Sequence, residues 1–466
     1  MQDKIMKIVV CIRQGLDGEI NPFDACAYEE ALKFENAEIT LLSMGVPATK
    51  DFLLNLTRLG AENAILLTDR AFAGADTLAT AYTLSLAIKQ LKPDLVLCGR
   101  QTLVGDTAQT APMLAQKLNI NLITNVMGIK YKDGVLNCET RNDGNITTSL
   151  PALLTVERIN TLRLPSIRSK VGTVTVLSAK DINADISKCG LAGSPTRVLE
   201  SRENKSGKRK CTFIEPCELL SVIEKSINKS KTELKPATNS IKNLNRVYVI
   251  GNAPICFAKT ISDDITVLEL TSKEEIAKII EADKPNAVLW GSDSKSKQIS
   301  ALVASMLDLG LCADCTSLET DGENLFMIRP ALSGSVIAKI KSLTKPAMAT
   351  VRTTEDGTKD ITVCIGYGAK DYVNQVAEFA KSINADLAAT RKAVDNGIMP
   401  YIYQVGLTGK TVAPPVYIAI GVSGAVHHIV GMQKSGTVIA INNDKNAPIF
   451  DYADYGIICS DLCLIK

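Results

Sequence analysis

The chain has 466 residues, of which 46% are hydrophobic and 22% charged, so it can bury two or three domain-sized cores and is not broadly disordered. Its 52 basic residues nearly balance 50 acidic ones, and only 5% of its residues are aromatic. This composition argues against nucleic acid or an anionic membrane surface as the main partner.

Membrane insertion and secretion are not expected. No apolar run reaches the roughly 18 residues that a membrane span needs. The longest candidate, residues 416–432, is interrupted by His427 and His428. The N-terminal residues 1–12 have the pattern of a buried strand and are too short for a signal peptide. We therefore expect a cytoplasmic protein.

The 13 cysteines are scattered along the chain and predict no disulfide framework. One CxxC motif runs from Cys312 to Cys315, but no second pair completes a tetrahedral metal site. We expect no metal and favour a structural role for these cysteines.

The first 125 residues alternate between strand and helix patterns. A helical face spans residues 81–91, with Asp76 placed to cap its start, and another spans 111–118 after Asp106. This alternation predicts a mostly parallel sheet covered by helices. The predicted strands are residues 7–11, 37–44, 64–67 and 94–98.

The chain then repeats itself. The sequence Lys-Pro-Asp at 92–94 leads into a strand ending at Gly99, and Lys-Pro-Asn at 284–286 leads into one ending at Gly291. The segment PALLTV at 151–156 likewise matches PAMATV at 346–351. Two matches in the same order at nearly one spacing predict two related domains in one chain.

A polar stretch separates these halves, and a third block follows them. Residues 200–244 are rich in Lys, Ser, Asn and Glu, which favours an arm or linker, with a short apolar helix at 219–227. The third block again alternates strands and helices. We expect an α/β protein with two related nucleotide-binding-type domains and a doubly wound C-terminal domain. The predicted domains are residues 1–199, 200–244 (arm), 245–355 and 356–466.

Two glycine-containing turns in the third block, residues 406–410 and 421–424, are candidate phosphate-binding loops. Glycine lets backbone N–H groups approach a phosphate, and a helix predicted to begin at Gly424 would add its positive end. Such turns also close ordinary strand–helix joints. A hydrolase using Ser423 is not supported, because Gly424 follows the serine directly and the nucleophile-elbow spacing is absent.

These motifs resemble those of a known family. The segments 404–414 (QVGLTGKTVAP), 417–428 (YIAIGVSGAVHH), 440–442 and 447–450 resemble the FAD domain of the electron-transfer flavoprotein alpha subunit. The segments 21–24 (NPFD), 69–77 (DRAFAGADT), 98–101 and 105–109 resemble the beta subunit. The chain thus looks like a beta–alpha fusion joined within the polar stretch.

The resemblance implies two nucleotide sites. In the alpha-like half, Thr408 would lie near the flavin N5 and His428 near its O2 edge, where a donor tunes the ring. Ser423 and Gly424 would meet the pyrophosphate. The residues implied to bind FAD are Arg391, Gln404, Val405, Gly406, Thr408, Gly409, Ser423, Gly424, Ala425, His427, His428, Asn442 and Asp461. Those implied to bind a second nucleotide in the beta-like half are Cys11, Asp69, Gly99, Gln101, Asp106, Thr107, Ala108, Gln109 and Thr110.

The second nucleotide is AMP in simple carriers and FAD in electron-bifurcating relatives. The 69–77 segment looks more like the bifurcating kind, so we favour FAD. The implied partner is an acyl-CoA dehydrogenase-type flavoprotein of fatty acid β-oxidation, or another redox protein, with NADH and ferredoxin or flavodoxin added if the chain bifurcates. Residues 162–167 match the family's partner-docking loop.

The sequence also departs from the family. The turn at 365–370 lacks the arginine that the family places after the first strand of the FAD domain, and the alpha-like half is short. These departures leave a second hypothesis open, a nucleotide-sensing or scaffolding protein that has lost redox function.

Overall fold

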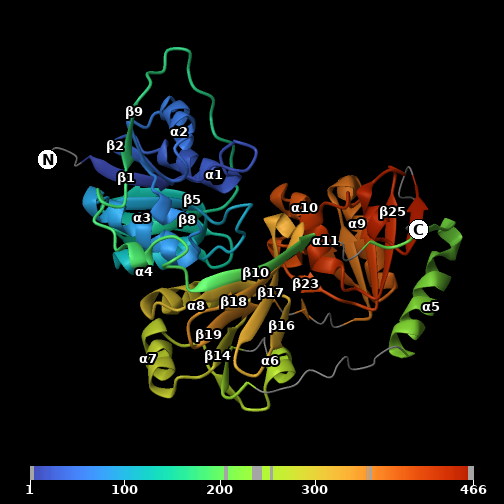
Figure 1. Ribbon diagram of the computed structural model, residues 1–466. Helices are drawn as coiled ribbons and strands as arrows, with labels where there is room; N and C mark the ends of the chain where they lie inside the picture. Colours follow the sequence, from blue (N-terminus) through green and yellow to red (C-terminus); the bar gives the residue numbers. More distant parts are fainter. Residues whose placement is uncertain are drawn as a thin grey trace. The chain divides into compact units, whose positions relative to one another are not determined.

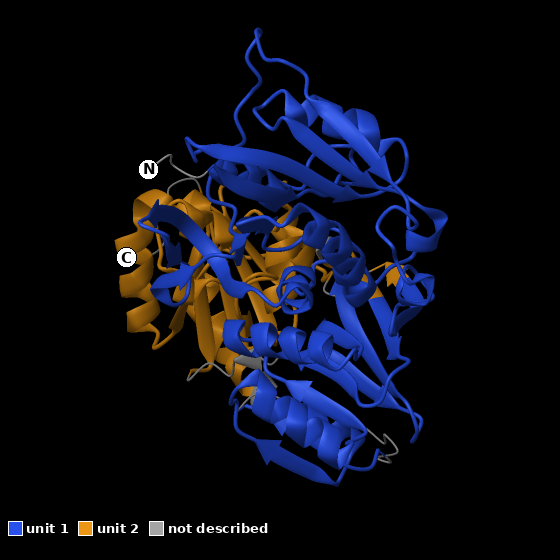
Figure 2. Ribbon diagram, turned by 90° about the vertical axis from the view of Figure 1, so that its left-hand side faces the viewer, with its two compact units in different colours: residues 1–201, 240–332, 338–351 blue, residues 202–239, 333–337, 352–466 orange. Residues whose placement is uncertain are grey.

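The computed structural model describes residues 5–203, 208–232, 244–251, 255–352, 354–355 and 359–459, without the side chains of 229–232, 333 and 354–355. The chain forms two compact units (Figure 2). Unit 1 comprises residues 1–201, 240–332 and 338–351, and unit 2 comprises residues 202–239, 333–337 and 352–466. No described helix is long and apolar enough to cross a membrane.

The first sheet of unit 1 has nine strands in the order β7-β6-β5-β8-β4-β1-β2-β3-β9 (Figure 1). The seven neighbouring strands from β5 to β9 in this order pair in parallel, and β6 and β7 extend the β5 edge by antiparallel pairing. The central strands β4 and β8 are buried along their whole length, as expected where helices cover both faces of a parallel sheet. The strands are β1 (Met6–Cys11), β2 (Ala37–Met44), β3 (Asn63–Leu67), β4 (Leu95–Gly99), β5 (Asn121–Lys132), β6 (Val135–Thr140), β7 (Gly144–Ser149), β8 (Ala152–Val156) and β9 (Thr173–Leu177).

The helices of this part are α1 (Pro22–Ala31), α2 (Thr49–Thr57), α3 (Thr77–Leu91) and α4 (Thr110–Leu118). The predicted cap of α3 is confirmed. Asp76 Oδ1 accepts the N–H groups of Leu78 and Ala79, both at 3.0 Å, which satisfies two backbone donors that a helix start leaves open.

The predicted internal repeat is visible in the second sheet of unit 1. Its strand order, β13-β12-β14-β19-β15, matches β2-β1-β4-β8-β5 of the first sheet. Lys92 and Lys284, at equivalent positions, both end a helix with φ 48°. The elements are β12 (Val247–Ile250), α6 (Ile255–Ile261), β13 (Ile265–Leu268), α7 (Lys273–Asp283), β14 (Ala287–Trp290), α8 (Ser294–Met306), β15 (Leu311–Cys315) and β19 (Ala347–Val351).

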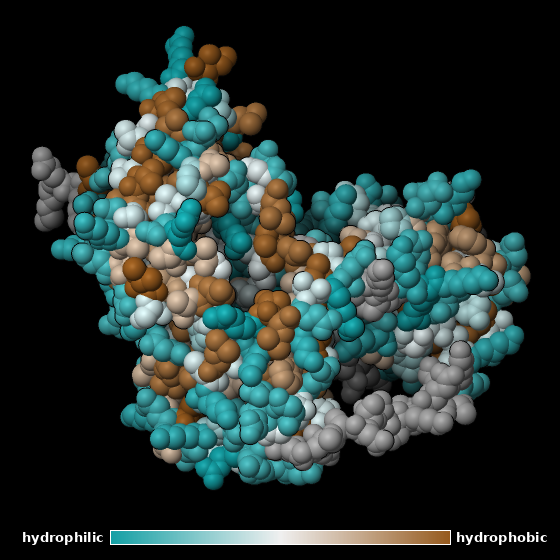
Figure 3. Space-filling view, in the orientation of Figure 1, coloured by the Kyte–Doolittle hydropathy of each residue, from teal (hydrophilic) through white to brown (hydrophobic). Residues whose placement is uncertain are grey.

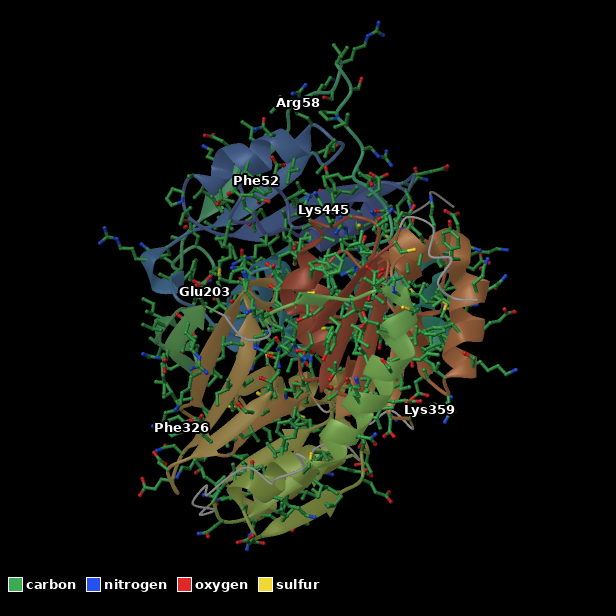
Figure 4. The ribbon with its side chains drawn as sticks, turned by 90° about the vertical axis from the view of Figure 1, so that its right-hand side faces the viewer. Phe52, Arg58, Glu203, Phe326, Lys359 and Lys445 are labelled. Carbon is green, nitrogen blue, oxygen red and sulfur yellow. The ribbon has the colours of Figure 1, made fainter. Side chains whose placement is uncertain are left out.

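A separate four-stranded sheet has the order β10-β18-β17-β16, and three of its strands, β16, β17 and β18, lie between β15 and β19 in the sequence. Its strands are β10 (Thr196–Glu203), β16 (Ser317–Thr320), β17 (Leu325–Ala331) and β18 (Val336–Ser342). Phe326 of β17, labelled in Figure 4, lies under the ammonium group of Lys339, 4.8 Å from the ring centroid.

Unit 2 is built on a six-stranded parallel sheet in the order β11-β26-β25-β24-β21-β22. Its strands are β11 (Thr212–Phe213), β21 (Ile361–Ile365), β22 (Asp386–Ala389), β24 (Val416–Ile420), β25 (Thr437–Asn442) and β26 (Tyr455–Ile458). Its helices include α9 (Val373–Ser382), α10 (Arg391–Asp395) and α11 (Val426–Met432), and β20 (Thr354–Glu355) pairs with β23 (Thr411–Val412).

Part of the predicted polar arm belongs to this unit. It contributes the edge strand β11 and helix α5 (Leu219–Thr232), whose Leu219 and Ile223 are buried in the core beneath the sheet (Figure 4). Arg209 fixes the same segment, because its guanidinium donates to the carbonyls of Gln433, Ser435 and Gly436 just after α11. The arm is therefore a packed part of unit 2 over these residues.

Candidate functional site

Unit 1 contains a cavity of about 1240 Å³ at the carboxyl ends of β1, β2, β3 and β4. The chain runs from β1 outward to β2 and β3, and then returns to place β4 on the other side of β1. Ligands bind at such a reversal of strand order in open parallel sheets. Of the nine residues predicted for the beta-like half, eight line this cavity: Cys11, Asp69, Gly99, Gln101, Thr107, Ala108, Gln109 and Thr110.

The ends of β1 and β4 are held together by a buried carboxyl group that the sequence analysis did not single out. Asp24 Oδ1 accepts the Gly99 N–H at 3.2 Å, and its Oδ2 accepts the Arg13 N–H at 2.8 Å. A Cβ atom at Gly99 would lie 2.3 Å from Asp24 Oδ1, so only glycine fits there. Burial raises the pKa of Asp24 to about 7.

Asp69 shapes the wall formed by the loop after β3. Its Oδ1 accepts the Ala71 N–H at 3.0 Å and its Oδ2 accepts the Ala179 N–H at 3.1 Å. These backbone hydrogen bonds lower the pKa of the Asp69 carboxyl. Both carboxylate oxygens thus hold the protein backbone, which makes Asp69 a residue that positions the loop.

The loop that enters α4 contains strained backbone and unpartnered polar atoms. Asp106 and Ala108 have φ values of 56° and 55°, a region that non-glycine residues rarely adopt. Asp106 lies beside the cavity lining, where its carboxylate accepts a hydrogen bond from Gln101. Gln109 is buried, and neither atom of its side-chain amide has a partner. A buried amide of this kind fits a polar ligand group on the cavity wall.

Arg329, from β17 in the second half of unit 1, completes the cavity wall. Its Nη1 donates to Gly105 O at 3.0 Å and its Nη2 to Asp106 O at 2.9 Å, while Nε has no partner. The side chain is 5% exposed, so a positive charge is held inside the cavity wall. The only hint of it in the sequence is a single arginine within the largely apolar strand LFMIRPA.

Unit 2 has a corresponding reversal of strand order between β21 and β24. The chain proceeds from β21 to β22 on one side and then places β24 on the other. The turns that leave β21 and β24 touch: Gly368 N–H donates to Gly421 O at 3.0 Å, and a Cβ atom at Gly366 would lie 2.1 Å from that oxygen. Glycine at both turns therefore allows backbone to meet backbone at the predicted ligand site.

The predicted 406–410 turn is held by side chains that precede it in the sequence. Gln404 is buried, its Nε2 donates to Thr408 Oγ1 at 2.7 Å, and its Oε1 has no partner. The Tyr401 hydroxyl donates to Thr408 O at 2.8 Å. Arg352, which the sequence analysis missed, donates to the carbonyls of Gly406 and Leu407. The half-buried Thr408 hydroxyl is thereby fixed in position.

The 421–425 turn differs from the prediction in one respect. Helix α11 begins at Val426, with Ala425 as its N-cap, and not at Gly424. Gly424 has φ 91°, and a Cβ atom there would lie 2.2 Å from Ile449 N, so the backbone is held in a non-helical conformation. Ser423 and Ala425 are exposed, and Gly409 packs against Gln404 O.

His428 is buried, whereas His427 is exposed. The His428 Nδ1 lies 3.1 Å from Val405 O, and its Nε2 lies 3.0 Å from the Tyr417 hydroxyl. Burial lowers the pKa of His428 to about 4, so the ring is neutral near pH 7. A neutral ring with its proton on Nδ1 donates to the carbonyl and accepts from the tyrosine. Its assignment to the flavin O2 edge stays a prediction.

The remaining predicted residues of unit 2 are positioned as follows. Arg391 begins α10 and its Nε donates to Asp395 Oδ2 at 3.0 Å. Asn442, at the end of β25, donates to Val422 O at 2.8 Å and so braces the 421–424 turn. Asp461 lies outside the described residues.

Comparisons with known proteins agree with this geometry. Residues 8–182 and 265–362 match the electron transfer flavoprotein domain, and residues 357–433 match the electron transfer flavoprotein FAD-binding domain. The chain is 39% identical over 224 residues to protein FixA of Azorhizobium caulinodans, covering 44% of this chain and 80% of that protein. It is 41% identical over 201 residues to the electron transfer flavoprotein subunit beta of Clostridium acetobutylicum, covering 41% and 78%.

The chain also matches an alpha subunit of this family. The electron transfer flavoprotein subunit alpha of Thermoanaerobacterium thermosaccharolyticum is 32% identical over 269 residues, covering 47% of this chain and 81% of that protein. Open parallel sheets with sites at the carboxyl ends of their strands define a doubly wound α/β protein. The chain belongs to the electron transfer flavoprotein family, with a beta-like N-terminal half and an alpha-like C-terminal region that carries the FAD-binding domain.

Proposed function

We propose that this protein is a cytoplasmic electron carrier of the bifurcating kind, with FAD in unit 2 and a second FAD in the cavity of unit 1. One observation carries the second assignment: the cavity of about 1240 Å³ is larger than the few hundred to 1,000 Å³ typical of small-ligand sites. A dinucleotide uses this space more fully than AMP does.

The side chains on the cavity wall support a nucleotide with phosphate groups. Arg329 offers a buried cation with a free Nε–H donor, and Gln109 offers both a donor and an acceptor. The start of α4 adds backbone N–H groups, which favour anions. Arg329 and Gln109 would thus hold the ligand, and FAD would supply the electron-accepting ring.

In unit 2, the residues around the two glycine turns fit the FAD that the family implies. The buried Gln404 Oε1 lacks a partner, and Ser423, directly before Gly424, is exposed. We assign the pyrophosphate to the 421–424 turn and the flavin to the Thr408 loop. In this assignment Gln404 and Arg352 position the Thr408 loop, and Asn442 positions the turn.

The partner is proposed to be an acyl-CoA dehydrogenase-type flavoprotein that docks on the loop between β8 and β9. Leu164 is 89% exposed and Ile167 fully exposed. Figure 3 shows apolar surface at the tip of this loop, which projects at the top of the view. Arg163 anchors its base through a bidentate ion pair with Glu29. An exposed apolar anchor on a fixed base suits insertion into a partner's pocket.

The experiment that tests the unit 1 assignment replaces Gln109 with leucine, which keeps the side-chain volume and removes both polar atoms. Nucleotide released from unit 1 on denaturation should fall, while the FAD of unit 2 should be retained. Ser187→Ala, an exposed change elsewhere in unit 1, is the matched control. Equal nucleotide content in wild type and the Gln109→Leu variant would contradict the assignment.

A further inference from the structure

The cavity wall of unit 1 carries a pair of thiols at the end of β15. Residues three apart in a regular strand point to opposite faces of the sheet. Here the pairing with β19 shifts register between Cys312 and Cys315, and Asp314 between them has φ 52°. Both side chains belong to one core cluster, and the Cys315 thiol donates to the Cys312 carbonyl oxygen at 3.8 Å.

The two thiols have different environments. Both side chains are buried, but Cys312 lines the cavity and Cys315 does not. The neighbouring Cys315 thiol lowers the pKa of Cys312 against the opposing effect of burial, and the positive charge of Arg329 also lowers it. Burial raises the pKa of Cys315. A thiol on a cavity wall with a second thiol three residues away is the arrangement of an attacking and a resolving cysteine.

We propose that Cys312 and Cys315 form a redox-active pair that closes to a disulfide by exchange with a small organic disulfide entering the cavity. The Cys312 thiolate attacks one sulfur of that disulfide, its S–S bond breaks, and the first small thiol leaves with the proton lost by Cys312. Cys315 then attacks the Cys312 sulfur and releases the second small thiol with the Cys315 proton. Two protein thiols are oxidised and one disulfide is reduced, so the electrons balance.

The pair does not depend on which nucleotide the cavity holds, because the step uses only the two thiols and the entering disulfide. It nevertheless adjoins the nucleotide loop, since Arg329 beside it donates to the carbonyls of Gly105 and Asp106. The state of the pair and the nucleotide content are measured separately, so either assignment can fail without the other.

The test uses the full-length, fully reduced protein and hydroxyethyl disulfide as the probe, with incubation until the pattern of alkylation no longer changes. After acid quenching, alkylation and trypsin digestion, Cys312 and Cys315 lie together on one peptide, residues 298–339, that contains no other cysteine. Mass spectrometry then distinguishes the doubly alkylated, mixed-disulfide and internal-disulfide forms of this peptide.

The wild type should convert to the internal disulfide and return to the dithiol with excess 2-mercaptoethanol. Cys315→Ser should stop at a mixed disulfide on Cys312, and Cys312→Ser should leave Cys315 reduced. Cys138, a buried thiol in unit 1 whose pKa burial raises to about 11, is the internal control and should stay reduced. A peptide that stays doubly alkylated while the exposed Cys217 becomes oxidised would overturn the proposal, as would first reaction at Cys315.

Discussion

His428 should give unit 2 a stability that depends on pH. Burial lowers the pKa of the folded ring from the ordinary 6.5 to about 4. Between these values the unfolded chain binds a proton that the folded chain excludes. The stability that unit 2 gains from the neutral His428 ring is therefore fully present above pH 6.5 and is lost as the pH falls toward 4. At 1.36 kcal/mol per pKa unit, the loss amounts to about 3 kcal/mol.

The perturbation that isolates this effect is His428→Gln, which keeps a donor and an acceptor but does not titrate. Hydrogen exchange of β24 and β25 peptides across a urea series gives the free energy of unfolding of unit 2. The sole tryptophan, Trp290, reports on unit 1 separately by fluorescence. Between about pH 7 and pH 4, the wild type should lose about 3 kcal/mol more than the variant. An equal loss in both proteins would refute the reasoning.

Three further changes have clear expected outcomes. Ile167→Ala should cost roughly 2 kcal/mol of docking energy and so slow electron transfer to an acyl-CoA dehydrogenase, with no change in FAD content. Ile186→Ala, at another exposed position, should leave the transfer rate unchanged. Equal stopped-flow rates for wild type and Ile167→Ala would show that the loop does not take part in docking. Gly366→Ala places a Cβ atom 2.1 Å from the Gly421 carbonyl oxygen and should abolish FAD binding in unit 2. In the control Gly128→Ala the nearest atom to the new Cβ is 3.7 Å away, and FAD content should be unchanged. Retained flavin absorbance in the Gly366 variant would show that FAD binding does not need the close contact between the two turns. Asp76→Ala removes the acceptor of the Leu78 and Ala79 N–H groups and of the Thr196 N–H and hydroxyl, so it should destabilise unit 1 by at least about 1 kcal/mol in urea titrations followed by Trp290 fluorescence. An unchanged midpoint would mean that these hydrogen bonds contribute nothing.

The strands and the internal repeat could be read from the sequence because they depend on local patterns. Residues 361–365 and 416–420 are continuous apolar runs, and helices cover both faces of the parallel sheet they form, so the runs mark the strands directly. The start of α11 was two residues later than predicted, because a close contact with Ile449 fixes the conformation of Gly424.

Features that depend on distant segments could not be predicted in this way. Arg329 reaches the 105–106 loop from more than two hundred residues away. The placement of Cys312 and Cys315 in one core cluster accompanies an irregular strand pairing, and the burial of His428 depends on packing against Val405 and Tyr417. A motif identifies such residues, but only the folded contacts show which atoms remain available to a ligand.

The measurement that tests the central claim most directly is the identity and number of nucleotides released per chain when the natively purified protein is denatured. Chromatography against FAD and AMP standards gives both amounts, and the chain concentration gives the ratio. We predict two FAD per chain, one from each unit. One FAD together with one AMP would contradict the second FAD in unit 1, and a protein with no FAD that cannot be loaded with it would contradict the electron-carrier function itself.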